Sequence, residues 1–291
     1  MNISPELEKL VRQLLALGVA VVIVITAPGG AGGTGTGGSP QTIVLTPTAM
    51  PRPSSGVPRP SRSPQPSTTA SPSADAGGTA AEAFGWGEPN RVDEFDAGNP
   101  GEGWTIYDGP GHDGQGTRSP SAVGLVEGIL KITGDASGTT AGMAWNPGQA
   151  YGRWEARVKA PAGNPSYHAL LLLWPDAEDW PVGGEIDFME MMEPTRQVTN
   201  MFVHYGADNS QVSGEVKVDG TQWRNWAVEW TPDHIAAFVD GKEWYRTTEP
   251  AAIPSRPMHL CIQLDYLPGG GNAGNSTMEI DWVRQYAAPG A

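Results

Sequence analysis

Three carboxylates, Glu185, Asp187 and Glu190, stand within six residues of an otherwise apolar segment. A buried strand has little structural use for three acids, because each desolvated charge is costly unless it is paired or protonated. Side chains alternate along a strand, which puts Glu185 and Asp187 on one face and Glu190 on the other. We expect a β-bulge at Phe188–Met189, since one extra residue returns Glu190 to the shared face and bulges are common beside active sites.

The bulge would leave the two glutamate backbones about 13 Å apart along the strand. Side chains that lean inward would then bring the carboxyl groups to about 5–5.5 Å, the separation found in retaining glycosidases. In that chemistry one carboxylate stays ionised to attack the anomeric carbon, and the other stays protonated to donate to the leaving oxygen. The spacing therefore predicts glycoside hydrolysis by two carboxylates, and a solvated acidic strand is the alternative.

Several further segments resemble one known family and occur in the order that the family has them. They are YGRWEAR (residues 151–157), WP (180–181), EIDFME (185–190), HYG (204–206), WAVEWTP (226–232), VDG (239–241) and IDWVRQY (280–286). On these motifs, residues 91–287 resemble glycoside hydrolase family 16, in the laminarinase-like form whose active-site strand carries a bulge.

The resemblance implies that Glu185 is the nucleophile, Glu190 the general acid/base and Asp187 the residue that orients and tunes the pair. Trp180 is expected to stack on a sugar, because pyranose faces present apolar C–H groups to aromatic planes; a core tryptophan is the alternative. His204 is expected to contact the substrate or the acid/base, or else to be structural. Further candidates for substrate binding are Trp174, Trp226 and Gln263.

Two positions qualify what the resemblance implies. The family often has WPAFWLLP where this chain has HALLLLWP, so His168 and Leu172 replace groove tryptophans and weaken the expectation of a β-1,3-glucan substrate. Asp281 stands where many relatives hold a structural calcium on the convex face with the help of backbone carbonyls; a surface aspartate is the alternative. The resemblance implies no catalytic metal and no organic cofactor.

The pattern beyond Asp93 has the period of two that strands show. Polar residues alternate with Trp154, Ala156 and Val158, residues 169–174 form a continuous apolar run, and residues 234–246 around Asp240-Gly241 read as a β-hairpin. Short strands with frequent Gly and Pro predict an all-β, antiparallel β-sandwich. The resemblance implies its jelly-roll, concanavalin A-like version, with a concave sheet as substrate groove.

The net charge indicates which classes of substrate the protein can bind, and the cysteine content indicates whether it can form a disulfide. The formal net charge of −14 argues against nucleic acid and polyanionic substrates, whereas a neutral polysaccharide meets no repulsive field. The single cysteine, Cys261, excludes an intramolecular disulfide and reads as a small buried hydrophobe. We expect a monomer with one globular domain of roughly 200 residues.

The N-terminal third has a different composition from the rest. Residues 14–27 form an apolar run that fits a signal peptide or a membrane anchor over residues 1–27, with membrane contact through residues 7–27. Residues 28–90, rich in Gly, Pro, Ser and Thr, predict a disordered linker, in which the strand-like stretch 42–45 has nothing to pack on. We therefore expect an extracellular or surface-anchored protein whose catalytic domain, residues 91–288, folds and acts when the chain begins near Gly87.

These observations together predict an exported endo-acting hydrolase of β-linked polysaccharide. A β-1,3- or β-1,3/1,4-glucan is the expected substrate, with a galactan as the alternative, and configuration is expected to be retained. A non-catalytic glycan-binding module and a transglycosylase of the same fold are the rival interpretations.

Overall fold

The computed structural model describes residues 21–25, 41–45, 78–268 and 274–290 of the 291-residue chain. The chain divides into two units, residues 1–68 and 69–291. In the first unit, β1 (Val21–Ile25) and β2 (Gln41–Leu45) pair as an antiparallel ribbon. The expectation that the stretch 42–45 has no partner is therefore wrong.

The apolar run near the N-terminus is only partly described. Its residues 21–25 form the strand β1. In the described part of the chain, no helix is both long enough and apolar enough to cross a membrane. Residues 1–20 and most of residues 28–77 lie outside the described part, so the signal or anchor and the linker stay predictions.

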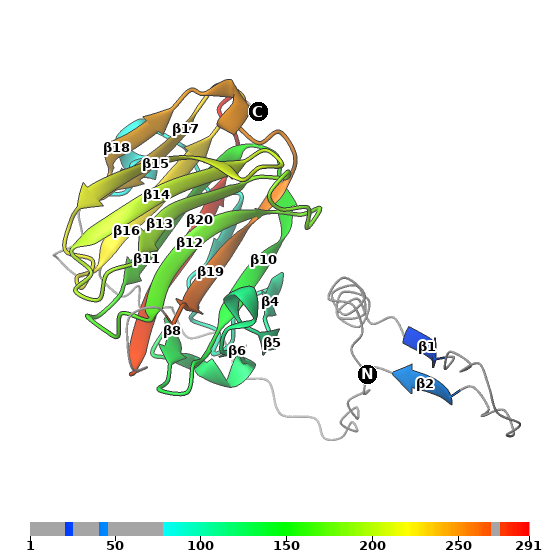
Figure 1. Ribbon diagram of the computed structural model, residues 1–291. Coiled ribbons are helices and arrows are strands. Elements are labelled where there is room, and N and C mark those ends of the chain that lie inside the picture. The colour runs from blue at the N-terminus through cyan, green and yellow to red at the C-terminus, as the bar shows by residue number, and fades with distance from the viewer. Residues whose placement is uncertain (1–20, 26–40, 46–77, 269–273, 291) are drawn as a thin grey trace, which may run out of the picture. The chain divides into compact units, whose positions relative to one another are not determined.

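The second unit is built from two packed antiparallel sheets (Figure 1). One sheet has the spatial order β15 (Ser210–Lys217), β14 (Val198–Tyr205), β13 (Glu185–Met191), β12 (Tyr167–Pro175), β19 (Met258–Tyr266), β10 (Gly142–Gln149) and β4 (Trp104–Ile106). The other has the order β18 (Lys242–Thr247), β17 (Ile235–Val239), β16 (Arg224–Trp230), β11 (Gly152–Lys159), β20 (Ser276–Tyr286), β8 (Ile129–Gly134) and β7 (Val123–Val126), with β3 (Arg91–Asp93) paired to β20.

Short elements complete this unit at its edges. They are a small sheet of β5 (Gly109–Pro110), β6 (Thr117–Arg118) and β9 (Thr139–Thr140), and the 3₁₀ turns η1 (His112–Gly114), η2 (Pro120–Ala122) and η3 (Pro250–Ala252). The predicted antiparallel β-sandwich is confirmed.

The core fills the space between the two sheets, as the period-two pattern requires. Trp154, Ala156 and Val158 of β11 face it, and so do the odd-numbered residues 167–173 of β12. Alternate residues of β12, among them Leu170 and Leu172, lie on the opposite, outer face of the seven-stranded sheet. This outer face is the one that carries the acids.

A bulge interrupts β13 where the sequence predicts it. Leu171 of β12 pairs with Met189 while Leu172 pairs with Asp187, so Phe188 is the extra residue. The pairing with β14 shifts at the same place. Phe188 and Met189 are neighbours in the chain, yet both are fully buried in the core, which an unbroken strand would not allow. The predicted bulge is confirmed.

Residues 78–90, here called the N-terminal strap, belong to the folded unit. The helix α2 (Ala80–Phe84) begins with a capping box, in which Thr79 and Glu82 each accept a hydrogen bond from the other's backbone N–H. It ends at Gly85, whose left-handed backbone (φ 62°) suits a residue without a side chain.

The strap packs on the eight-stranded sheet. Trp86 is only 8% exposed and, with Ala80, forms a cluster with Ala227, Ala236, Phe238 and Tyr286. Glu155 of β11 lies fully buried under the helix and accepts hydrogen bonds from the backbone N–H groups of Ala80 (2.6 Å) and Ala81 (3.3 Å). The predicted boundary at residue 91 is therefore wrong, because this short amphipathic segment buries enough apolar surface to dock.

Candidate active site

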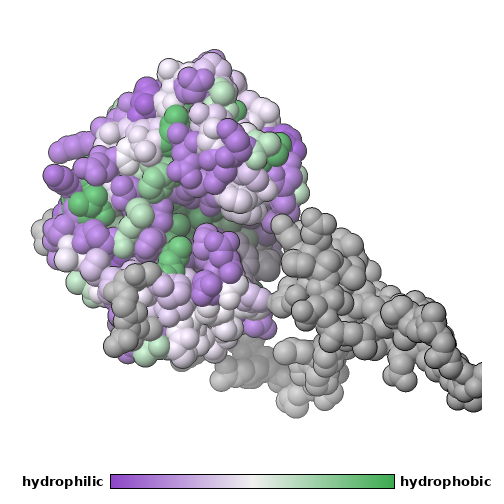
Figure 2. All heavy atoms as spheres, viewed as in Figure 1, coloured by the Kyte–Doolittle hydropathy of each residue, from purple (hydrophilic) through white to green (hydrophobic). Residues whose placement is uncertain are grey.

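The outer face of the seven-stranded sheet has an apolar floor beside the acids. Ala144, Leu170, Leu172 and Cys261 form one buried cluster, against which Tyr107 and Trp174 pack. Figure 2 shows apolar atoms gathered in the middle of this face between hydrophilic ones. Cys261 is buried, as predicted, and its Sγ lies 3.2 Å from the Tyr107 hydroxyl. The floor is suited to the apolar faces of sugar rings.

The bulge brings the three acids to this one face, and two histidines reach them. His204 of β14 lies opposite Glu185 in register, and its Nε2 is 3.3 Å from Oδ2 of Asp187. His168 of β12 places its Nδ1 3.0 Å from Oε1 of Glu190. Asp187 is the most deeply buried of the three acids at 3% exposure, while Glu185 and Glu190 are partly exposed. The two glutamates are thus the acids that a substrate can reach.

Burial and mutual repulsion keep protons on this cluster. Burial, and then the negative charge of Asp187, raise the pKa of Glu185 to about 9, whereas His204 and a hydrogen bond from the Trp180 side chain act to lower it. Burial, and then the charge of Glu190, raise the pKa of Asp187 well above its usual value. Because both pKa values are raised, the neighbouring Glu185 and Asp187 together hold at least one proton near neutral pH.

Two tryptophans flank the acids on the side of Glu185. Trp180 is 41% exposed, and its ring is nearly parallel to that of Trp174, with 6.3 Å between centroids and 10° between planes. Trp174 is held by a hydrogen bond from its Nε1 to Glu178 (2.8 Å). The Trp180 ring also lies 6.1 Å from the His204 ring. The two rings form an aromatic platform beside Glu185. Sugar stacking on Trp180 and Trp174 stays a prediction.

The structure corrects one predicted substrate contact and refines two others. Trp226 is fully buried in the core between the sheets, so it cannot touch a substrate. His204 lies against Asp187, whereas the histidine that contacts Glu190 is His168. Gln263 does lie on the outer face, in register with Leu170, but it is 6% exposed and accepts a hydrogen bond from Arg118 (2.6 Å).

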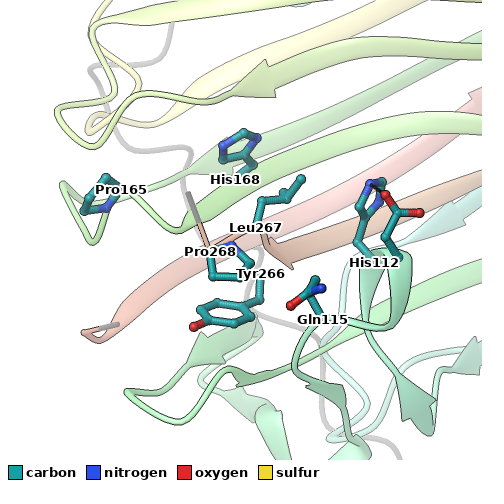
Figure 3. A pocket seen from close by; sticks show the side chains of 8 residues that line it. His112, Gln115, Pro165, His168, Tyr266, Leu267 and Pro268 are labelled. Carbon is teal, nitrogen blue, oxygen red and sulfur yellow. Dashed lines mark ion pairs between the residues drawn. The ribbon is translucent and has the colours of Figure 1, made fainter. Parts of the chain in front are cut away.

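A polar layer and a hollow adjoin His168, the partner of Glu190. Arg118 donates to Asp265 (2.7 Å), which lies opposite His168 in register, and His112 comes within 3.7 Å of the same carboxylate. The hollow has a volume of about 640 Å³, and His112, Gln115, His168 and Tyr266 line it with neighbouring residues (Figure 3). Sequence reasoning missed Arg118, which no motif marks. It noted His168 only as standing in place of a tryptophan. The usable signal was that His168 lies two residues before Leu170, which pairs with Glu190, and so shares its face.

Metal ligation is also constrained by these contacts. In the described residues, Glu185, Asp187 and His204 are the group of three or more His, Cys, Asp or Glu side chains that converges closely enough to hold an ion. Asp281 is not part of such a group, and its carboxylate forms an ion pair with Arg157. The guanidinium of Arg157, in contact with the Asp281 carboxylate, would repel a divalent cation there, so these residues do not fit the predicted calcium site.

The chain matches the family model of the glycosyl hydrolases family 16 over residues 115–284, more than half of its length. It is 32% identical over 166 residues to a beta-glucanase of Rhodothermus marinus, covering 47% of this chain and 57% of that protein. It is 29% identical over 166 residues to the glucan endo-1,3-beta-glucosidase A1 of Niallia circulans, covering 47% of this chain and 24% of that protein. The chain thus spans about half or less of these relatives.

The fold agrees with solved structures that carry related names. LamAcat of Zobellia galactanivorans superposes with a TM-score of 0.62 at 21% identity, covering 70% of this chain and 100% of that one. The laminarinase of Rhodothermus marinus gives a TM-score of 0.62 at 24% identity, covering 68% and 96%. At these identities the likeness concerns the fold, whereas the family-model match covers the acids, the bulge and both flanking strands. The chain belongs to glycosyl hydrolase family 16.

Proposed function

We propose that the protein is an endo-acting hydrolase of β-linked glucan that retains the anomeric configuration. The observation that carries this proposal is the bulge at Phe188, which puts Glu185, Asp187 and Glu190 on one exposed face of the sheet. Two carboxylates on one strand, with a third between them, suit a double displacement at a single glycosidic bond.

In the proposed reaction Glu185 attacks the anomeric carbon as the C–O bond to the leaving sugar breaks. Glu190 gives its proton to the leaving oxygen, and a glycosyl ester forms on Glu185. Water then attacks the anomeric carbon, Glu190 takes up a proton from that water, and the C–O bond to Glu185 breaks. No cofactor takes part in these steps.

The proton shared by Glu185 and Asp187 must reside on Asp187 for the attack to occur. Two features favour this distribution, and both act against the hydrogen bond between the two carboxyl groups, which raises the pKa of Glu185 and lowers that of Asp187. Asp187 is more deeply buried, which disfavours its charged form, and the Trp180 side chain donates a hydrogen bond to Glu185, which favours the charged form of that residue. Protonated Asp187 can then donate to Glu185 and hold its attacking oxygen in place.

A neutral glucan is the substrate class that the site supports best. The aromatic platform of Trp174 and Trp180 and the apolar floor suit sugar faces, and a net charge of −14 disfavours anionic polymers. The names of the relatives, a beta-glucanase and a glucan endo-1,3-beta-glucosidase, agree with this choice. Leu172 stands where the family often has a groove tryptophan and gives the floor less aromatic surface, so we propose that mixed-linkage glucan is accepted as well as β-1,3-glucan.

Reducing-sugar release from a panel of polysaccharides tests the proposal. Laminarin, mixed-linkage glucan, agarose, carrageenan and xyloglucan are compared, with Glu185→Gln as the inactive variant and Glu229→Gln, on the other sheet, as the control. We expect hydrolysis of the glucans by the wild type and the control, and none by Glu185→Gln. Binding without hydrolysis by the wild type would instead identify a glycan-binding module, and longer products would identify a transglycosylase.

We also propose that the protein is exported and monomeric. The support for export is the apolar run at residues 14–27 followed by a Gly- and Pro-rich tract. Fractionation of cells that express the full chain tests this proposal, and retention in the cytosol would contradict it. Light scattering of the purified protein tests for a monomer.

A further inference from the structure

His168 contacts Glu190, the acid/base of the proposed reaction. It stands on the outer face of β12, near the beginning of the strand, and its Nδ1 lies 3.0 Å from Oε1 of Glu190. Both side chains are largely buried, with 13% and 14% of their surfaces exposed. Water competes weakly for a hydrogen bond in such a place, so the contact is held.

Other charged groups around this contact have partners of their own. Asp265, opposite His168 in register, is bound by Arg118 and lies near His112. Asp187, on the strand of Glu190, lies against His204. The other carboxylates near His168 and Glu190 thus have cationic or histidine partners of their own, so the acid that the His168 imidazole binds is Glu190.

We propose that His168 is a positioning residue whose Nδ1–H donates to Oε1 of Glu190 and thereby directs the catalytic proton to Oε2. The proposal rests on the function proposed above. A carboxylic acid carries one proton, and an oxygen that accepts a hydrogen bond from Nδ1–H is the poorer place for it. The proton then sits on the oxygen that is free to face the leaving sugar. The opposite tautomer would accept that proton from Glu190 and withhold it from the substrate.

The same ring lines the hollow between η1 and the end of β19 (Figure 3). With Nδ1 used as a donor, Nε2 carries a lone pair that can accept a hydrogen bond from a hydroxyl group. The class of ligand that fits the hollow is a neutral sugar of the leaving part of the glucan, since Gln115 and Tyr266 add polar and aromatic surface. One imidazole would then connect the binding of the leaving sugar to the orientation of its proton donor.

Two variants of similar size test the proposal. In His168→Asn the side-chain amide can occupy the place of Nδ1 and donate, whereas His168→Leu cannot. On glucan we expect kcat/KM to fall about 100-fold in His168→Leu, within the range of general acid catalysis, and about 10-fold or less in His168→Asn. On a dinitrophenyl β-glycoside, whose leaving group needs no proton, we expect His168→Leu to change kcat/KM less than about 3-fold.

The pH dependence gives a second readout. A carboxylate that loses an N–H donor holds its proton more tightly, so the alkaline limb of kcat/KM moves to higher pH in His168→Leu. The matched control is His234→Leu, which removes a similar contact on the other sheet, between His234 Nε2 and Glu229 Oε1 at 2.8 Å. It leaves both the substrate ratio and the pH profile unchanged.

Equal losses on both substrates, with an unchanged pH profile, would overturn the proposal and leave His168 a structural residue. Nitrogen-15 NMR of the imidazole in the Glu185→Gln variant decides the tautomer even if the other variants fold poorly. A proton on Nδ1 supports the proposal, and a proton on Nε2 alone overturns it. Failure of the wild type to cleave any glucan would refute the proposed function itself, while the NMR result still reports on the His168–Glu190 contact.

Discussion

Replacing Glu155 by glutamine should remove a pH dependence of stability that originates outside the active site. Glu155 is fully buried between β11 and the N-terminal strap. Burial raises its pKa to about 7, although the N–H groups of Ala80 and Ala81 and the charge of Arg284 act to lower it. The native protein therefore binds a proton on Glu155 more tightly than the unfolded chain does.

The sign and size of the effect follow by linkage. The folded pKa is about 7 and the ordinary value is 4.5, so Glu155 stabilises the fold fully below the ordinary value, and this contribution is lost as the pH rises through 7. At 1.36 kcal/mol per pKa unit the loss between about pH 4 and about pH 8.5 is about 3 kcal/mol. Glutamine does not titrate, so the free energy of unfolding of the variant should rise by about 3 kcal/mol relative to that of the wild type over this pH range.

Denaturant unfolding of both proteins at the two pH values measures this difference, and any constant loss of a hydrogen bond cancels from it. Glu229→Gln is the control of opposite sign. Burial acts to raise the pKa of Glu229, but hydrogen bonds from Arg153 and His234 lower it below its usual value. The Glu229→Gln variant therefore becomes less stable relative to the wild type as the pH rises. A stability difference for Glu155→Gln that is flat with pH, or that slopes like the control, would refute the reasoning.

Three further predictions concern the boundary, the tryptophans and the acid cluster. A chain beginning at Gly87 lacks Trp86 and should unfold at a lower denaturant concentration than one beginning at Gly78. A buried tryptophan removes about 150–250 Å² from water, worth about 4–6 kcal/mol before the entropy of ordering the strap is subtracted. Equal midpoints would show that the strap contributes nothing to stability. Trp180→Ala should cost about 1 kcal/mol or less but impair glucan hydrolysis, whereas Trp226→Ala should destabilise by about 3–5 kcal/mol; the reverse order would exchange their roles. Asp187→Asn should lower kcat at least about 100-fold while removing a stability loss at high pH, since the folded pKa of Asp187 is raised; unchanged activity would contradict the role of its proton.

The sandwich and its bulged strand could be predicted from the sequence because both depend on local alternation. Trp154, Ala156 and Val158 are buried as their period requires, and the acids reveal the bulge by their odd spacing. The strap was harder to predict. Its capping box at Thr79 and its glycine stop at Gly85 are readable, but the surface on which it docks is made by strands far along the chain.

The errors at the site arise because a strand pattern tells neither which sheet the strand joins, nor which of its faces meets the other sheet, nor its register with its neighbours. Trp226 alternates with its neighbours as a groove residue would, but its strand β16 belongs to the eight-stranded sheet, and there Trp226 faces the core. The contact between His168 and Glu190 depends on the registers of β12 and β13 on both sides of the bulge, which the sequence leaves undetermined.

The stereochemistry of hydrolysis tests the central claim most directly. Proton NMR is recorded in the first minutes of glucan hydrolysis, before the product anomers equilibrate. If Glu185 and Glu190 act together from one face of β13, the reaction passes through an ester on Glu185 and the first product is the β anomer. Glu185→Ala should then be inactive but partly rescued by azide, which gives an α-glycosyl azide. An initial α anomer from the wild type would contradict the account.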